Sequence, residues 1–275
     1  MFKNHLNDTV INLALPQVMG ILNVTPDSFF SDSRTEVIDL AVKKAQNMVT
    51  QGAGILDIGG QSTRPGATII TVDEEIKRVV PIIEAIHAIL PATPISIDTY
   101  HSQVAQAAIE AGASIVNDIS CGNFDEKMID VVVANQVGYI GMHQTGTPST
   151  MHQVEQRNDI MENLIQYFTI KKAAFAAKGL TEWIIDPGFG FSKTIAENFT
   201  IVKSLATLKS LGLPILLGVS RKSSIYKTIG VDADAALNGT TVLNTIGLLG
   251  GANILRVHDV KEAKEAILLV NQMNA

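Results

Sequence analysis

The 275-residue chain has a single cysteine, Cys121, so it cannot form an internal disulfide, which fits a reducing, cytoplasmic environment. No apolar stretch approaches the roughly 20 uninterrupted residues of a membrane-spanning helix, and the first residues lack the apolar segment of a signal peptide. No basic tract offsets the net charge of −6. The composition therefore argues against membrane and nucleic-acid partners. We expect Cys121 to pack in the core.

Charged residues make up only 17% of the chain and apolar residues 46%, which is ample material for a hydrophobic core. No linker, low-complexity segment or block of charge divides the sequence. A length of 275 residues fits one large α/β barrel or two ordinary domains. Because the composition does not change abruptly along the chain, we expect a single domain over residues 1–275.

Short apolar runs alternate with segments of helical spacing from residue 18 onward. The expected strands are residues 18–24, 55–59, 95–98, 115–119, 139–143, 184–186, 215–219 and 254–257. The expected helices are residues 36–51, 73–90, 101–111, 127–135, 158–178, 194–211, 235–249 and 260–272. About eight such units in ~250 residues are typical of a (β/α)8 TIM barrel, and a doubly wound open sheet is the alternative. The count and the even spacing favour the barrel, with residues 1–15 as an N-terminal extension over it.

Polar residues stand at the end of nearly every expected strand. They are Asn23, Asp57, Asp98, Asn117, Asp118, His143, Asp186, Ser220 to Lys222, and Arg256 to His258. A barrel gathers the carboxyl ends of all its strands around one mouth. We therefore favour a shared ligand site over the alternative in which each polar residue caps its own turn.

The stretch Trp183–Phe191, WIIDPGFGF, shows this arrangement most clearly. Three large apolar residues lead directly into Asp186, as in a buried parallel strand, and Pro187 and Gly188 then end the strand. A carboxylate is thus expected where a buried strand leaves the sheet, beside a backbone bare enough to lie close to a ligand. Taken alone, Asp186 could equally cap the following turn.

The residues at the mouth divide into two chemical sets. The hydrogen-bonding set is Asp98, Asn117 and Asp186, and the basic set is Arg64, Lys222, Arg256 and His258. A carboxylate can accept two parallel N–H bonds, so the first set suits a flat, donor-rich heterocycle. The basic set suits phosphate oxygens, which arginine can bind bidentately. Arg256 and His258 are two residues apart, so on a strand they point to one side, and a salt-bridged surface pair is the alternative.

Asn23 supplies an amide oxygen that suits Mg²⁺, although one asparagine alone is a weak signal. The loops at residues 25–30 (TPDSFF) and 62–67 (STRPGA) combine Gly or Pro with hydroxyls and a charge, as mobile covers of active sites do. Either loop alone could be an ordinary barrel connection. Ser223 opens a helix after SRK, so it could receive an anion such as a carboxylate, or cap the helix, or both.

These segments together resemble the dihydropteroate synthase family of pterin-binding enzymes. The matching segments are GILNVTPDSF (20–29), LDIGGQSTRPGA (56–67), ISIDT (95–99), IVNDI (115–119), MH with a Gly/Pro loop (142–148), DPGFGF (186–191), GVSRKS (218–223) and RVHDV (256–260). The resemblance implies a pterin-binding (β/α)8 barrel that forms a homodimer and depends on Mg²⁺. It implies condensation of 6-hydroxymethyl-7,8-dihydropterin diphosphate with 4-aminobenzoate in folate biosynthesis, and inhibition by sulfonamides.

The resemblance also assigns a role to each matched residue. The implied pterin-binding residues are Asp98, Asn117, Met142, Asp186, Lys222 and Arg256. The implied diphosphate-binding residues are Asn23, Arg64, Arg256 and His258, with Mg²⁺ at Asn23. The implied aminobenzoate-binding residues are Phe29, Thr63, Pro65, Phe191 and Ser223. Lys222, Arg256 and His258 are the expected catalytic residues. The sequence departs from the family's common pattern at Gln61, where Glu is usual, and at Ser192, where Gly is usual.

The implied reaction displaces diphosphate from a methylene carbon beside an electron-rich ring, so a loose, carbocation-like path is reasonable. The nucleophile is an aromatic amine that is already neutral at neutral pH, which explains why no Ser/His/Asp or Cys/His constellation is needed. Two alternatives stay open at this point. One is a methyltransferase of the same barrel type that acts on a folate, and the other is a non-catalytic relative that binds pterin without turnover.

Overall fold

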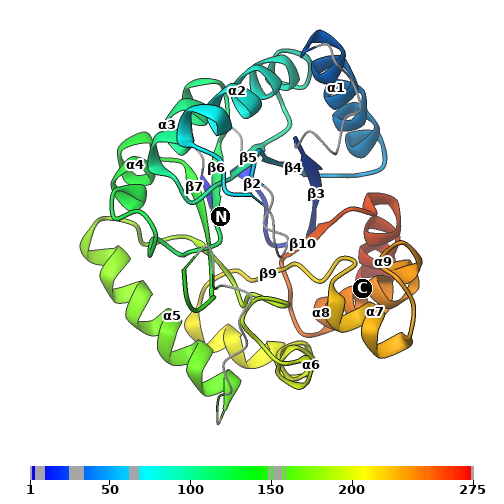
Figure 1. The fold of residues 1–275 in the computed structure, drawn as a ribbon. Coiled ribbons are helices and arrows are strands. Elements are labelled where there is room, and N and C mark those ends of the chain that lie inside the picture. Colours follow the sequence, from blue (N-terminus) through cyan, green and yellow to red (C-terminus); the bar gives the residue numbers. More distant parts are fainter. Residues whose placement is uncertain are drawn as a thin grey trace.

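Eight parallel strands close around one axis in the computed structural model, and helices surround them (Figure 1). The structure describes residues 2–3, 10–24, 34–61, 68–147, 150, 157 and 159–273. The barrel strands are β3 (Gln17–Asn23), β4 (Ile55–Gly59), β5 (Ile95–Asp98), β6 (Ile115–Asp118), β7 (Gly138–Met142), β8 (Ile184–Asp186), β9 (Leu216–Leu217) and β10 (Ile254–Val257). They follow the order β8-β7-β6-β5-β4-β3-β10-β9. A bridge between Ile185 and Ile215 closes the ring, so the barrel prediction is confirmed and the open sheet is excluded.

Each barrel strand is followed by one α-helix, except β9, which is followed by the two helices α7 and α8. They are α1 (Arg34–Thr50), α2 (Val72–Ile89), α3 (Ser102–Glu110), α4 (Met128–Asn135), α5 (Ile160–Ala177), α6 (Ile195–Lys203), α7 (Ser223–Ile229), α8 (Leu237–Leu249) and α9 (Val260–Met273). None of the described helices is long and apolar enough to cross a membrane. Cys121 is buried, as the sequence predicts.

Most elements begin or end within two residues of the expected boundaries, and two differ more. The helix expected over residues 194–211 ends as α6 at Lys203 and is followed by a 3-10 helix, η2 (Leu205–Leu211). Leu205, Leu208 and Leu211 are all buried, and a helix with three residues per turn places such a three-residue spacing on one face. The strand expected over residues 215–219 is paired only at Leu216 and Leu217.

An apolar plug fills the amino-terminal half of the barrel. Its members are Leu13, Met19, Ile55, Ile115, Ile140, Ile184, Leu216 and Ile254, all buried. Seven of these come from seven different strands, and Leu13 precedes β3. Because side chains alternate between the two faces of a strand, residues two positions further along each strand also point into the barrel, one layer closer to the mouth.

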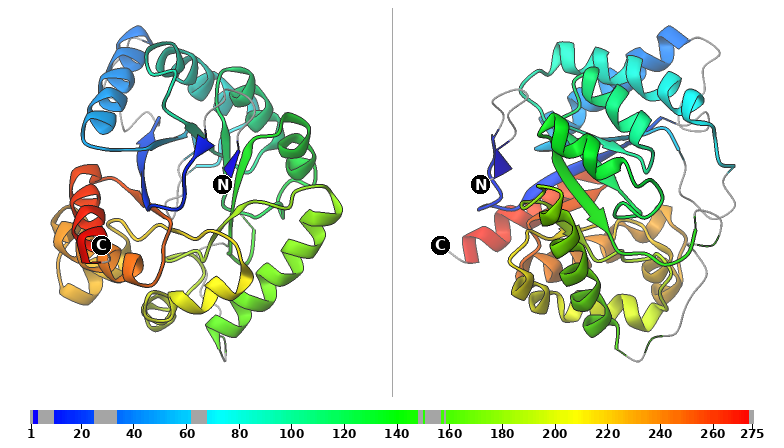
Figure 2. Two further views of the ribbon diagram at one scale, coloured as in Figure 1. Left: turned by 180° about the vertical axis from the view of Figure 1, so that it is seen from behind. Right: turned by 90° about the vertical axis from the view of Figure 1, so that its left-hand side faces the viewer.

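The first residues form a short hairpin, in which β1 (Phe2–Lys3) pairs antiparallel with β2 (Val10–Ile11). Figure 2 shows this hairpin, seen from behind, in front of the middle of the barrel. The backbone near it is tied to the barrel, because the side-chain amide of Asn253 donates to the carbonyl of Leu13. That residues 1–15 are an extension of a single domain remains a prediction.

Candidate active site

The mouth of the barrel is lined by the residues one layer above the apolar plug. Asp57, Asn117, Met142, Asp186 and Arg256 each stand two positions after a plug residue on the same strand. Asp98 stands two positions after the buried Ser96 on β5, and Asn23 ends β3 four positions after Met19. The period of two therefore explains why side chains from six or more strands converge at one depth. The neighbouring Asp118 has the opposite parity and accepts from the Tyr139 hydroxyl at 2.9 Å.

Arg256 lies at the centre of this layer. Its Nε donates to Oδ2 of Asp57 at 2.6 Å, and its Nη2 donates to Oδ2 of Asp98 at 2.5 Å. The same Asp57 oxygen accepts from Nδ2 of Asn117 at 3.2 Å. Asp57 is completely buried. One carboxylate thus fixes two of the predicted binding residues, while the guanidinium joins it to a third.

Burial raises the pKa of two carboxyl groups at the mouth. Desolvation raises the pKa of Asp98 to about 7, with Arg256 opposing the rise and Asp57 adding to it. Desolvation also raises the pKa of Asp186, against the attraction of Lys222. Oδ1 of Asp186 accepts from the backbone N–H of Gly188 at 2.7 Å, so its second oxygen is the one left for a ligand. Three carboxylates and two cations make the deep half of the site slightly acidic, which suits the donor edge of a heterocycle.

Lys222 lies between β9 and α7, directly before the first residue of α7. Its Nζ donates to the carbonyl of Phe189 and lies 4.5 Å from the centroid of the Phe191 ring. Desolvation lowers its pKa to about 8, although Asp186 favours the charged form. Arg221, next to it, has a left-handed backbone with φ of 53° and turns away to pair with both oxygens of Asp259. The amine therefore faces the pocket while the neighbouring guanidinium does not.

One wall of the mouth is apolar. Met142 packs there with Tyr100 and Ile119, and Phe124 and Phe191 pack against this group. Phe191 thus lies between the apolar wall and the amine of Lys222. A flat ring bound at this depth would meet an aromatic and thioether surface on this side.

His258 lies beyond the end of β10 and does not share the contacts of Arg256. Its Nδ1 is 3.0 Å from Oγ of Ser220, and its backbone N–H donates to the same oxygen. Partial desolvation in the concave mouth, followed by repulsion from Arg256, lowers its pKa to about 4. The sequence predicted His258 as a member of a basic set, and the lowered pKa favours the neutral ring, which offers hydrogen bonding.

The remaining predicted residues make few described contacts or lie outside the described residues. Asn23 is half-buried, and no described residue makes a hydrogen bond with its side chain. Ser223 is the first residue of α7 and is half-buried. Phe29, Thr63, Arg64 and Pro65 lie outside the described residues. The two loops expected to cover the site therefore stay predictions.

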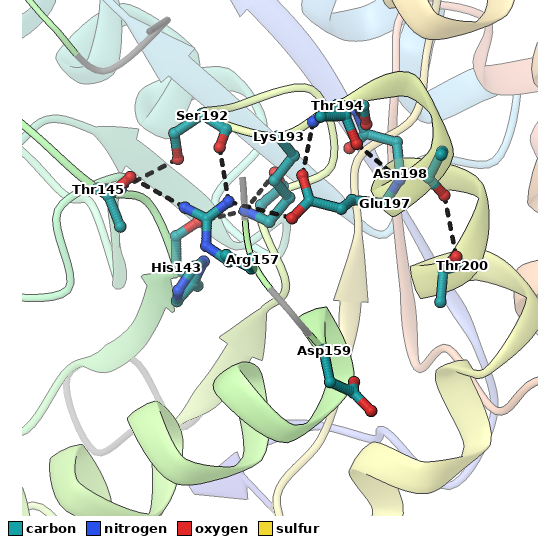
Figure 3. A network of polar contacts seen from close by, with 12 residues as sticks. His143, Thr145, Arg157, Asp159, Ser192, Lys193, Thr194, Glu197, Asn198 and Thr200 are labelled. Atoms are coloured by element: carbon teal, nitrogen blue, oxygen red, sulfur yellow. Dashed lines mark hydrogen bonds and ion pairs between the residues drawn. The ribbon is translucent and has the colours of Figure 1, made fainter. Parts of the chain in front are cut away.

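Two basic residues that the motifs did not single out, Lys193 and Arg157, donate hydrogen bonds to the loop after β8 and to the segment at the end of β7 (Figure 3). Lys193 is buried, and its Nζ donates to the carbonyls of His143, Gly188 and Phe191 at 3.0 to 3.1 Å. Arg157 donates to the Ser192 carbonyl at 2.8 Å and to Oγ1 of Thr145 at 3.0 Å. Desolvation lowers the pKa of Lys193 well below its usual range, and repulsion by Arg157 adds to this. In the sequence, a lysine beside a glycine-rich loop would be interpreted as a solvated residue. Only its neighbours in space show that Lys193 is buried.

His143 also belongs to this supporting layer. It follows Met142 and so points to the opposite face, where it is buried beside Tyr167, with ring centroids 4.8 Å apart. Desolvation, then repulsion by Lys193 and Arg157, lowers its pKa to about 2. The imidazole is therefore neutral and takes no part in the mouth.

The chain is similar to known proteins over almost its whole length. A family model described as pterin binding enzyme matches residues 19–258. Dihydropteroate synthase of Synechocystis sp. is 42% identical over 247 residues, which cover 89% of this chain and 85% of that protein. The Xanthomonas albilineans dihydropteroate synthase solved with 4-aminobenzoic acid is 36% identical, has a TM-score of 0.89, and matches 96% of this chain and 95% of its own. The same organism's enzyme in complex with 7,8-dihydropteroate is 33% identical with a TM-score of 0.86, over 96% of both chains.

The ion pairs of Arg256 predict a pH-dependent loss of stability in Arg256→Met. Without the guanidinium, Asp57 and Asp98 are left as buried charges, which costs on the order of 3–5 kcal/mol. The pKa of Asp98, already about 7 in the folded protein against an ordinary value of 3.8, should rise further. A carboxyl with a raised folded-state pKa stabilises the fold at low pH, and this stabilisation is lost as the pH rises through that pKa.

Thermal unfolding of wild type, Arg256→Met and Arg256→Lys at pH 5 and pH 8 measures this effect. We expect Arg256→Met to lose much more stability at pH 8 than at pH 5, and Arg256→Lys, which keeps the charge, to lose less at pH 8. Equal losses at both pH values would show that the carboxylates do not depend on Arg256 for their charge.

Proposed function

The chain belongs to the pterin-binding enzyme family, among the dihydropteroate synthases, and from this we infer that it condenses 6-hydroxymethyl-7,8-dihydropterin diphosphate with 4-aminobenzoate. The products are 7,8-dihydropteroate and diphosphate, and the enzyme is a transferase of folate biosynthesis. The observation that carries the assignment to this chain is its own acidic mouth, in which three carboxylates and Asn117 stand one layer above the apolar plug.

The deep half of the mouth supports a role in binding the pterin. The aminopyrimidinone edge of a pterin presents several N–H donors, and Asp186 and Asp98 offer carboxylate oxygens to them. Asn117 can both donate and accept, which suits the mixed edge of the ring. Met142 supplies an apolar surface, and Lys222, whose amine lies over the Phe191 ring, adds a donor. The pocket would thus select a flat, donor-rich ring.

The outer half supports a role in binding the diphosphate. Arg256 uses Nε and Nη2 for Asp57 and Asp98, so its Nη1 is the group that can turn to a phosphate oxygen while the rest of the guanidinium lies along the ring. His258 would donate as a neutral imidazole, and Arg64 would add a cation from the loop at residues 62–67. Together these groups would stabilise the charge that leaves with the diphosphate.

We propose that Mg²⁺ accompanies the diphosphate at Asn23. The described residues contain no cluster of three or more His, Cys, Asp or Glu side chains that could hold a metal ion alone. Asn23 does present an amide oxygen without a described hydrogen-bond partner at the strand end, which fits an ion held chiefly by water and phosphate oxygens. When bound, the ion would supply neutralisation of the leaving group's charge.

The chemical step requires little proton transfer from the protein. As the bond from the methylene carbon to the diphosphate oxygen breaks, the amine of 4-aminobenzoate forms the new carbon–nitrogen bond and then loses a proton. The amine is neutral beforehand, so the tasks of Lys222, Arg256 and His258 are to orient the ring and bind the departing charge. Phe191 and Ser223, with Phe29, Thr63 and Pro65, would hold 4-aminobenzoate, with its carboxylate near the start of α7.

We also propose a homodimer, on the strength of an exposed apolar face. Val242, Ile246 and Leu249 of α8 are exposed by 49%, 41% and 55%, and their spacing places them along one side of the helix. Ile229 at the end of the neighbouring α7 and Val231 after it are exposed by 49% and 39%. A face of this kind is typical of an interface between identical subunits.

A diphosphate-release assay with both substrates and Mg²⁺ tests the function. We expect release to require both the pterin diphosphate and 4-aminobenzoate, with 7,8-dihydropteroate formed in equal amount. Methyl transfer from a folate, or pterin binding without release, would contradict the assignment.

Asp186→Asn serves as the matched variant in the same assay. It keeps the size of the side chain but replaces an acceptor by a donor, and a buried unsatisfied group costs on the order of 1–3 kcal/mol. We expect the KM for the pterin diphosphate to rise about 10- to 100-fold, with a smaller fall in kcat. An unchanged KM with abolished turnover would place Asp186 in the chemical step.

Sedimentation equilibrium of wild type and Val242→Glu tests the dimer. A glutamate in an apolar interface is desolvated without a partner, so we expect the wild type to be a dimer and the variant a monomer with a similar unfolding temperature. Ile170→Glu on α5 is the control, because Ile170 is equally apolar and 62% exposed on another face. A monomeric wild type, or dissociation by Ile170→Glu alone, would refute this interface.

A further inference from the structure

The loop that joins β8 to α6 is held in a conformation that few sequences adopt. Gly188 has a φ of 72°, and any side chain there would overlap the carbonyl oxygen of His143. Ser192 has a φ of 47°, a left-handed conformation that is strained for a residue other than glycine. Such a loop keeps its shape only where surrounding groups determine it.

Several of the proposed substrate-binding residues depend on this loop. The Phe189 carbonyl accepts from Lys222, and the Phe191 ring lies 4.5 Å from the same amine. Phe191 also packs against the apolar wall that contains Met142. Through Gly190, which donates to Asn198, and Asn198, which donates to Ser224, the loop contacts the first turn of α7. A shift of the loop would therefore move Phe191 and Lys222 together.

Arg157 joins this loop to the end of β7. Nη1 donates to the Ser192 carbonyl at 2.8 Å and pairs with Glu197 at 3.5 Å, while Nη2 donates to Oγ1 of Thr145 at 3.0 Å. The Ser192 hydroxyl in turn accepts from the backbone N–H of Thr145 at 3.1 Å. Only 9% of the Arg157 side chain and 11% of Glu197 are exposed. Figure 3 shows the guanidinium between Thr145, Ser192 and Glu197.

Lys193 reinforces the same connection. Its three carbonyl acceptors require three donated protons, so the bonding geometry favours the ammonium form even though burial opposes it. Removing Lys193 would take a donor away from all three carbonyls, and only that of Gly188 would keep another donor, the backbone N–H of Phe191, so the substitution would destabilise the fold. Arg157 is the residue through which the connection can be weakened with less damage to the barrel, because one of its acceptors is a hydroxyl near the surface.

We propose that Arg157, together with Ser192, is a positioning residue of this enzyme: it fixes the loop of residues 187–193 and thereby places Phe191 and Lys222 for the substrates. The proposal rests on the function given above and adds a structural role for Ser192, which stands where the family usually has Gly. The Ser192 hydroxyl accepts from the backbone N–H of Thr145, and the Ser192 carbonyl accepts from Arg157. These two bonds offset the strain of the left-handed backbone at Ser192.

The same geometry explains a measurable property of Lys222. The amine is kept from water by Phe191 and the Phe189 carbonyl, and it faces Asp186 on β8, Asp98 on β5 and Arg256 on β10, with the charge of Lys193 behind the loop. Its pKa is about 8, so kcat/KM should fall above about pH 8 as the ammonium loses its proton. If the loop moves away, water reaches the amine and this alkaline limb shifts to higher pH.

Steady-state kinetics of wild type, Arg157→Met, Arg157→Lys and Ser192→Gly from pH 6 to pH 10 test the proposal. For Arg157→Met we expect the KM of both substrates to rise about tenfold, kcat to change less, and the alkaline limb to move upward by half a pH unit or more. Arg157→Lys should restore part of the effect, since it keeps the charge. Ser192→Gly should raise KM a few-fold without lowering the unfolding temperature, because it removes the hydroxyl but relieves the left-handed φ.

Lys172→Met is the matched control. Lys172 is an exposed residue of α5 whose amine donates to the Leu211 carbonyl at 2.6 Å, at the start of the segment that leads into β9 and so away from the mouth. Its loss should lower the unfolding temperature and leave KM and the alkaline limb unchanged. If Arg157→Met also lowers the unfolding temperature and leaves KM and the alkaline limb unchanged, Arg157 has only a structural role and the proposal is overturned.

A direct binding measurement tests the positioning role separately from the proposed reaction. The dissociation constant of the pterin diphosphate, measured by calorimetry for wild type, Arg157→Lys and Ser192→Gly, does not depend on turnover. A wild type that binds the pterin but releases no diphosphate would refute the proposed reaction, and weaker binding by the variants would still support the positioning role. Equal binding by all three proteins would refute the positioning role.

Discussion

A single buried carboxylate oxygen determines the geometry of the mouth. Oδ2 of Asp57 accepts both from Nε of Arg256 and from Nδ2 of Asn117, and Arg256 extends the connection to Asp98. Because Asp57 is fully buried, these bonds form in a medium of low dielectric constant, where they are stronger than in water and where loss of one partner is costly. The strands β4, β5, β6 and β10 are therefore linked by side chains at the level where the pterin is proposed to bind.

The opposite side of the mouth is determined by a different interaction. Lys222 approaches from the segment after β9, and its position depends on the loop after β8, which contacts it through Phe189 and Phe191. Lys193 and Arg157 hold this loop from behind. The site thus has one half positioned by short side chains on rigid strands and another positioned by a loop. The second half is the one in which small changes far from the substrates should alter binding.

The sequence predicted the barrel and most of its boundaries because every strand is a short apolar run with a polar residue at its end. Asp98, Asn117, Asp186 and Arg256 could be found in this way, since the period of two places them all on the inner face. The partners of these residues could not be found, because the bond of Arg256 to Asp57 joins residues 199 positions apart. Burial of Lys193 and the lowered pKa of His258 likewise depend on neighbours from other parts of the chain.

Binding of the pterin diphosphate to Asp57→Asn, measured by calorimetry beside thermal unfolding, tests the central role of Asp57 most directly. The substitution keeps the shape of the side chain and removes the charge that holds Arg256 and Asn117. The interpretation predicts an affinity at least about tenfold weaker, since a charged hydrogen bond contributes roughly 1.5–3 kcal/mol, in a protein that still unfolds cooperatively. Wild-type affinity in a folded Asp57→Asn variant would contradict it.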